Sequence, residues 1–207
     1  MDDNKTTFMD ESIIEMITDK ENELEQEERL TRIKKEISRG FVTFKGECME
    51  FIEKSLFEDR IKIFLPKDFE LMDRETASIK YPYEARPNPI FTDNTTTKNV
   101  TFNYTQSDVD EDGIGEFKDS MRIVLERMQP SANWLEDAIE QINGRNVGFF
   151  EIVIPALDAN VYNLMFFTEL SGMALIGCIN CLEEDMEDWI PVAKGIMSSL
   201  KILDKDE

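Results

Sequence analysis

Residues 143–203 read NGRNVGFFEIVIPALDANVYNLMFFTELSGMALIGCINCLEEDMEDWIPVAKGIMSSLKIL. Three apolar segments in this stretch are separated by residues typical of turns, and a helical pattern follows them. The expected strands are 149–155, 161–168 and 173–182, the turns lie at 143–144, 158–160 and 169–172, and the helix covers 186–200. Short turns between successive strands favour antiparallel pairing. The stretch therefore predicts a three-stranded meander followed by an amphipathic helix.

The segments before residue 143 add further strands and one clear helix. Alternating residues predict strands at 60–65, 77–81 and 99–105, and the prolines between 82 and 94 indicate a loop. Residues 41–57 stay unassigned, and 134–142 fit either a helix or a strand. A helix is predicted from 116 to 129, where Pro130 ends it, because five apolar residues share one face: Phe117, Met121, Val124, Leu125 and Met128.

The strands of the meander are apolar on both faces near their centres. Residues 165–167 and 174–176 are consecutive apolar side chains, whereas a strand with one solvated face alternates. We expect the helices at 116–129 and 186–200 to cover one face of the sheet. The second face then needs the N-terminal helix, a long loop or a partner. The fold class is α+β, an antiparallel sheet flanked by helices as in an α/β/α sandwich.

The first 40 residues form a charged helical extension before the α+β domain, which we place at 41–207. Sparse apolar residues from Ile13 to Ile37 follow a loose helical stripe, and Gly40 is a helix stop. Three arrangements are open for this helix. It docks on the domain, it pairs with another copy of the chain through residues 10–38, or it stays solvated.

Composition excludes several classes of function. With 44 acidic and 23 basic residues, the net charge of -21 disfavours nucleic acid and anionic lipid as partners. No apolar run is long enough for a membrane span, and the first residues lack a signal-peptide pattern, so a cytoplasmic location is expected. The chain has no histidine, which excludes histidine-based triads and zinc sites. We therefore expect no enzyme.

The three cysteines are predicted to be structural thiols. Cys178 and Cys181 are three residues apart within an apolar strand, so their side chains point to opposite faces of the sheet. A disulfide or a shared metal ion would need them on the same side. Cys48 has no neighbouring cysteine in the sequence.

The order of strands and helices resembles that of the PsbP-like superfamily, which includes the bacterial DcrB-like domains. The resemblance covers about residues 60–203 and rests on soft motifs rather than a catalytic signature. The carriers are Arg60–Pro66, Asn143-Gly144-Arg145, Tyr162-Asn163-Leu164, Trp189 and Ser198-Ser199-Leu200. The resemblance implies an antiparallel sheet flanked by helices and a binding or assembly role. In the DcrB-like group it also implies chaperones that hold apolar segments of secreted toxins against the sheet.

An acidic loop resembles the first half of a calcium-binding loop. Asp108, Asp110 and Asp112 occupy positions 1, 3 and 5, and Gly113 occupies position 6. Position 12 is Asp119, which is shorter than the usual bidentate glutamate. The alternative is that these acids favour the positive end of the helix that follows. Calcium is the only cofactor that the sequence indicates.

Two groups of residues are candidates for contact with a protein partner. Tyr81, Tyr83 and Arg86 lie in a proline-rich loop and are of the types common at binding hot spots. The alternative is that these aromatic residues pack on the sheet edge. Met165, Phe167 and Met173 lie on the meander, where methionine adapts to varied apolar partners and where ordinary core packing is the alternative.

These observations lead to a non-enzymatic, cytoplasmic interaction protein as the first hypothesis. In its most concrete form, it is a chaperone or adaptor that holds an apolar segment of a client protein on the sheet or on the 81–86 loop. A calcium-binding module built on Asp108–Asp119 is the second hypothesis. A hydrolase that uses paired carboxylates is the third, and no spacing in the sequence supports such a pair.

Overall fold

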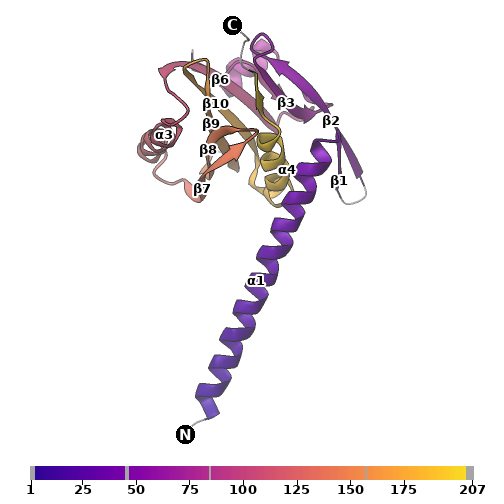
Figure 1. Cartoon of the computed structure of the whole chain (residues 1–207), viewed down its shortest axis with the longest axis vertical. Helices are drawn as coiled ribbons and strands as arrows, with labels where there is room; N and C mark the ends of the chain where they lie inside the picture. The colour runs from indigo at the N-terminus through magenta and orange to yellow at the C-terminus, as the bar shows by residue number, and fades with distance from the viewer. Residues whose placement is uncertain (1–2, 45–46, 84, 157, 204–207) are drawn as a thin grey trace.

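Two antiparallel sheets and four α-helices make up the part of the chain that the structure describes (Figure 1). The structure is a computed structural model, and it describes residues 3–44, 47–83, 85–156 and 158–203. No helix in these ranges is both long and apolar enough to cross a membrane. In chain order the elements are α1 (Asp3–Ile37), β1 (Phe41–Phe44), β2 (Glu47–Leu56), β3 (Ile61–Pro66), β4 (Glu70–Leu71), α2 (Arg74–Lys80), β5 (Ile90–Thr92), β6 (Asn99–Asp108), α3 (Ile114–Met128), β7 (Asn133–Ile142), β8 (Arg145–Pro155), β9 (Asn160–Leu170), β10 (Met173–Leu182), a 3-10 turn (Glu183–Asp185), α4 (Met186–Ser198) and β11 (Lys201–Ile202).

The larger sheet has seven strands in the order β4-β5-β6-β10-β9-β8-β7, and the predicted meander forms its centre. The turn between β7 and β8 has positive φ at both Asn143 and Gly144, which suits the right-handed twist of a tight hairpin. Ser171 and Gly172 repeat this arrangement between β9 and β10. The smaller sheet has the order β1-β2-β3-β11, and β11 forms its edge by antiparallel pairing with β3. The predicted meander is therefore confirmed.

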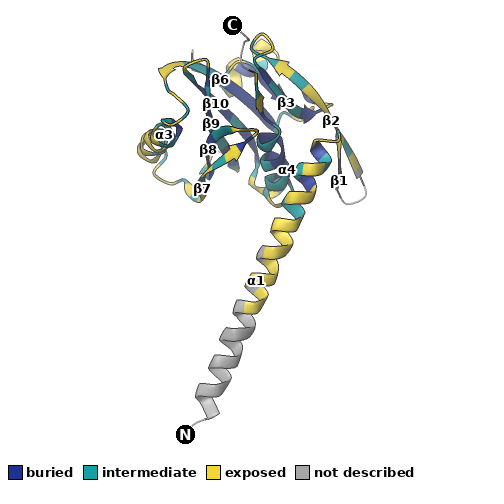
Figure 2. Cartoon of the chain, in the orientation of Figure 1, coloured by how far each residue is buried: buried dark blue, intermediate teal, exposed yellow. Residues whose placement is uncertain are grey.

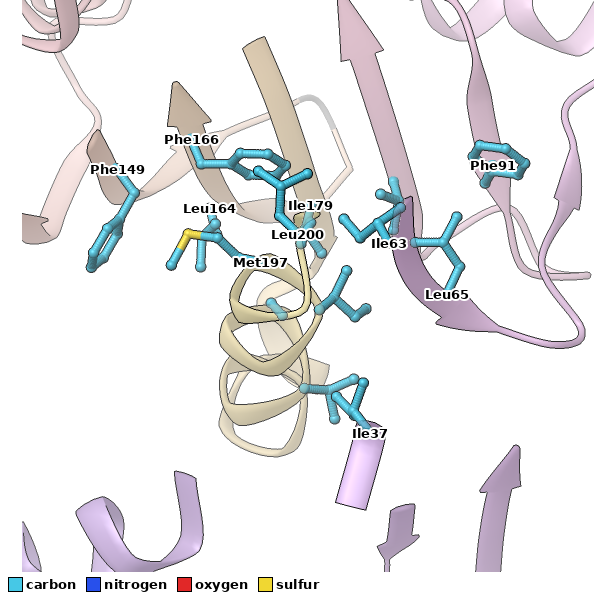
Figure 3. Packing of buried hydrophobic residues seen from close by; sticks show 14 of the residues in the cluster. Ile37, Ile63, Leu65, Phe91, Phe149, Leu164, Phe166, Ile179, Met197 and Leu200 are labelled. Carbon is cyan, nitrogen blue, oxygen red and sulfur yellow. The ribbon is translucent and has the colours of Figure 1, made fainter. Parts of the chain in front are cut away.

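The main hydrophobic core lies between the two sheets, with α4 at its centre (Figure 3). One face of α4 buries Trp189, Val192, Ile196 and Met197. The inward side chains of the meander, such as Phe166, meet this helix, and Ile63 and Leu65 of β3 meet it from the other side. We call this side of the seven-stranded sheet the inner face.

The outer face of the same sheet is covered in part by α3. Phe150, Ile152 and Phe167 point outward from β8 and β9 and form a small second core with the underside of α3. The expectation that α3 and α4 share one face is therefore wrong, because each helix covers its own face. The cause is the alternation of strand side chains, which sends Phe166 to α4 and Phe167 to α3.

The strand predicted at 77–81 is also wrong, since these residues belong to α2 and its C-terminal cap. Asp73 caps this helix, because its carboxylate accepts hydrogen bonds from the amides of Glu75 and Thr76. The segments that the sequence left open are strands, with 134–142 in β7 and most of 41–57 in β1 and β2.

The helix α1 extends away from the folded domain, and among its side chains whose burial the structure describes, those that are buried lie at its C-terminal end (Figure 2). Ile33 and Ile37 belong to the main core, and Ile37 packs against Gly195 of α4. Arg29 forms an ion pair with Asp188, with 3.1 Å between the nitrogen and the carboxylate oxygen. The base of α1 is therefore packed on the domain, and the helix ends at Ile37, three residues before the predicted boundary at residue 40.

Candidate functional site

The rotation of α3 on the outer face is fixed by charges along its β7 side. Lys118 and Arg122 both bind the carboxylate of Asp137 on β7, and Arg122 also stacks over Trp134 at 4.6 Å. Burial alone would raise the pKa of Asp137, but the hydrogen bonds from Lys118 and Arg122 lower it instead. The Asp137 carboxylate therefore stays charged and holds α3 by its β7 side.

The opposite side of α3 faces β10 and exposes apolar side chains. Ser120 and Phe117 line a cavity with Asp108 and Gly172, which lie at the ends of β6 and β10, so this side of the helix points toward those strands. Val124 follows one turn after Ser120, and its side chain is 47% exposed. Met128 continues this side of the helix and is more exposed still. The apolar stripe on α3 is thus wider than the sheet surface beneath it.

The sheet next to this side of α3 is apolar as well. Met165 of β9 and Ile176 of β10 pack against the second core and are only partly buried, as is Met121 of α3. Val124 and Met128 of α3 and these three side chains are the apolar residues around the second core that we group together, and three of the five are methionines. We call this group the methionine strip and define it as Met121, Val124, Met128, Met165 and Ile176.

Tyr81 lies on the same outer face, further along β10. It interacts with Asn180 and lies near Cys178, and burial raises the pKa of its hydroxyl to about 12. Burial also raises the pKa of the Cys178 thiol to about 12, so this cysteine is a poor nucleophile at neutral pH. Cys181 points into the main core instead, and both thiols are free. For Tyr81, the structure thus shows packing on the sheet.

Tyr83 and Arg86 are placed differently from Tyr81. Tyr83 is the most exposed large apolar side chain among the described residues. Arg86 lines a separate cavity of about 760 Å³ between α2 and β5, together with Arg74 and Asn88. The three candidate residues of this loop therefore do not form one cluster.

The three candidates on the meander are also separated from one another. Phe167 has no exposed surface, because it lies between Phe117 and Phe150 with ring centroids at 5.9 and 5.2 Å. Met173 begins β10, whereas Met165 lies opposite Cys178, five residues further along that strand. At about 3.3 Å per residue this separates the two methionines by roughly 16 Å. Only Met165 belongs to the methionine strip.

The sequence pattern placed the helix residues of the strip on one apolar face together with Phe117. Met121, Val124 and Met128 share the period of Phe117, and a period does not show how far the sheet beneath the helix extends. The sequence therefore carries no signal that separates the exposed residues of this face from the buried ones.

The aspartates of the proposed calcium loop have separate roles. Asp110 accepts a hydrogen bond of 2.8 Å from the amide of Gly113 and so stabilises the turn before α3. Asp119 lies on α3 itself and forms an ion pair with Lys118 at 2.8 Å. Asp108 and Asp112 are exposed. Within the described ranges, no group of three or more acidic or cysteine side chains is arranged to hold a metal ion.

One buried carboxylate lies on the inner face, at the junction with α4. Glu151 accepts a hydrogen bond of 2.9 Å from the Tyr162 hydroxyl and pairs with the Lys194 ammonium at 2.8 Å. Lys194 also binds Glu136. Burial alone would lower the pKa of Lys194, but the hydrogen bonds that its ammonium donates to both glutamates raise it, so the ammonium stays charged beside the Glu151 carboxylate. This arrangement explains how a carboxylate is tolerated in the core.

No family model and no curated protein matches the sequence. Among solved structures, the cyanobacterial PsbP protein CyanoP from Synechocystis sp. PCC 6803 aligns with 78% of this chain and 98% of its own chain, at 11% identity and a TM-score of 0.56. The fold is PsbP-like. This confirms the fold class and, for the fold alone, the resemblance that the sequence indicated.

Two other matches among the solved structures have TM-scores below 0.5. The protein of unknown function PA94 from Pseudomonas aeruginosa is 11% identical and covers 76% of this chain and 99% of its own, with a TM-score of 0.44. LpqN from Mycobacterium tuberculosis, which is involved in cell envelope biogenesis, is 11% identical and covers 75% and 92%, with a TM-score of 0.46. At these identities the matches describe the fold alone.

Proposed function

We propose that this protein is a non-catalytic interaction module that holds an apolar segment of a partner protein on the methionine strip. The observation that carries the proposal is the exposed apolar side of α3, where Val124 and Met128 extend the outer core into solvent beside Met165 and Ile176. Monomeric proteins usually avoid continuous apolar surface of this kind unless it serves binding.

The composition of the strip supports a binding role. Three of its five members are methionines, whose unbranched and polarisable side chains adapt to partners of different shape. Tyr81 lies further along the same face and gives this surface a rigid aromatic group. The surrounding protein is strongly acidic, so we expect the bound segment to be flanked by lysine or arginine.

Two adjacent residues of α3 provide a matched test. Ile123 and Val124 are 50% and 47% exposed, but Ile123 points away from the sheet, because each helical residue turns by about 100°. Substitution of either residue by glutamate adds the same charge to the same helix. Only Val124→Glu places that charge on the methionine strip.

The experiment selects peptides from a phage-displayed library on the full-length protein and measures their affinity for both variants by calorimetry. We expect apolar peptides with basic flanks, bound at least tenfold more weakly by Val124→Glu and unchanged by Ile123→Glu. Equal effects of the two substitutions, or no selectable peptide, would contradict the proposal. Circular dichroism of both variants controls for folding.

A further inference from the structure

The cavity between α2 and β5 has a composition unlike that of the rest of the chain. Its volume of about 760 Å³ is in the range of small-molecule sites, and Arg74 and Arg86 both line it. None of the nine described residues that line it is acidic, although 44 of the 207 residues of the chain are. By contrast, three acidic residues line the cavity beside α3, and three line the groove between α1 and α4. The cavity between α2 and β5 is therefore a cationic site on an anionic protein.

The polar side chains of this cavity have no partner of opposite charge. Among the described residues, none forms a hydrogen bond or an ion pair with the guanidinium of Arg74 or Arg86, and the side-chain amide of Asn88 is unpaired there as well. The acid next to Arg74 in the sequence, Asp73, is engaged in capping α2 through backbone amides of that helix. Arg86 is half-buried, and burial removes part of its hydration. Three groups that can donate hydrogen bonds therefore line one cavity that supplies no carboxylate to accept them.

The backbone holds both walls of the cavity on the sheet. On the α2 side, the amide of Met72 donates a hydrogen bond of 2.9 Å to the carbonyl of Ile90 in β5. On the other side, the amide of Asn88 donates a hydrogen bond of 2.8 Å to the carbonyl of Phe102 in β6. Both walls are thus positioned before a ligand binds, which lowers the entropy cost of binding.

Much of the remaining lining is apolar. The side chain of Leu71 in β4 lines the cavity and is 65% exposed, and the buried Ile90 of β5 lines it as well. Apolar side chains beside two arginines suit a ligand that joins an apolar body to an anionic head group. The guanidinium fork matches carboxylate and phosphate groups equally well in geometry, so both are candidates for the head group.

We propose that this cavity binds a small amphiphilic acid, with its carboxylate or phosphate at Arg74, Arg86 and Asn88 and its apolar chain along Leu71 and Ile90. In the order of the large sheet, β6 and β10 separate β5 from β9, which carries Met165 of the methionine strip. The inference therefore concerns a different surface and does not depend on the proposed function.

The first test measures the binding of octanoate and octyl phosphate to the full-length protein by calorimetry. Acetate, which lacks the chain, and 1-octanol, which lacks the charge, are the controls. The anion concentrations reach about 5 mM, because a ligand of this size in a fitting site has roughly millimolar affinity or better. We expect both anions to bind and both controls to bind at least about tenfold more weakly, since each control loses one part of the recognition. The tighter of the two anions identifies the head group.

No binding of either anion, or a control that binds as tightly as octanoate, would overturn the proposal. Two double variants that remove equal charge then locate the site. Arg74→Gln with Arg86→Gln removes both guanidinium groups of the cavity, whereas Arg39→Gln with Arg127→Gln removes two exposed ones that do not line it. We expect the first pair to weaken octanoate binding at least about tenfold and the second to change it less than about twofold. Equal effects would show that net charge alone attracts the anion and would overturn the site.

A third variant and a direct map of the site guard against a folding defect in the arginine variants. Leu71→Glu changes an exposed side chain, so it adds a carboxylate to the cavity while the core stays intact. It should weaken octanoate binding about tenfold, because like charges repel at close range. In the unmodified protein, the amide NMR shifts induced by octanoate should be largest in α2 and residues 86–92. Largest shifts in α3 would place the anion on the methionine strip and overturn the proposal.

Discussion

Phe167 and Met165 are neighbours on the outward side of β9, and the structure assigns them opposite roles. Phe167 is enclosed between Phe117 and Phe150, whereas Met165 is partly exposed at the edge of the same core. The losses of unfolding free energy caused by Phe167→Ala and Met165→Ala therefore compare a buried core residue with a partly exposed residue on the same strand.

The expected cost follows from burial. Removal of a fully buried phenylalanine costs about 3–5 kcal/mol, because the lost contacts leave a cavity that the neighbouring aromatic rings cannot fill. Met165 keeps part of its surface in water, so its removal should cost roughly 1–2 kcal/mol. For a chain of this size, one kcal/mol shifts the melting temperature by about 2–4 °C, so Phe167→Ala should lower it by roughly 6–20 °C.

The two tryptophans make the effect measurable in each core separately. Trp134 lies 5.1 Å from Phe150 in the second core, and Trp189 lies in the main core. In a Trp134→Phe background, fluorescence during urea unfolding comes from Trp189 and reports the main core. In a Trp189→Phe background, it comes from Trp134 and reports the second core. If Phe167→Ala costs less than Met165→Ala, or under about 1 kcal/mol, the assignment of Phe167 to the core is refuted.

Three further predictions concern the inner face and the anchoring of α3. Lys194→Met should destabilise the fold by about 3–5 kcal/mol, because it leaves the Glu151 carboxylate buried without its ammonium partner, and adding Glu151→Met should recover part of the loss in urea unfolding. Gly177→Ala should cost about 2 kcal/mol or more in the same assay, since a Cβ atom at this position overlaps the ring of Phe166. Asp137→Asn should cost about 2 kcal/mol at pH 7. Because the folded pKa of Asp137 lies below its unfolded value of about 3.9, its stabilisation is present above about pH 4 and is lost as pH falls through the folded pKa, so the wild-type and variant stabilities should converge once the pH is below that folded pKa.

Local signals made the central part of the fold predictable. The turns at Asn143-Gly144 and Ser171-Gly172 adopt positive φ values that few residues tolerate, so their positions in the sequence define the hairpins. The amphipathic pattern of α4 is equally local. Residues 77–81 alternate like a strand, whereas the Asp73 cap that favours a helix lies before them, so the local pattern predicts the wrong element there.

The layer arrangement and the binding face depend on contacts between distant segments. Pairing of β11 with β3 joins residues about 140 positions apart, and no local pattern indicates it. Likewise, Phe117 and Val124 show the same helical period, but Phe117 packs against the second core on the sheet, whereas Val124 is exposed to solvent. Met165 could be proposed from the sequence as a partner contact, whereas Val124 and Met128 required the position of α3.

The most direct measurement of the central claim is site-specific photocrosslinking in the native host at two neighbouring positions. A benzophenone side chain replaces Val124 in one strain and Ile123 in another, at native expression levels. The binding role predicts a discrete crosslinked protein at position 124 that is absent or much weaker at position 123, and that disappears when Met128→Glu is added. Crosslinking of equal strength at both positions, or none at position 124, would contradict a partner on the methionine strip.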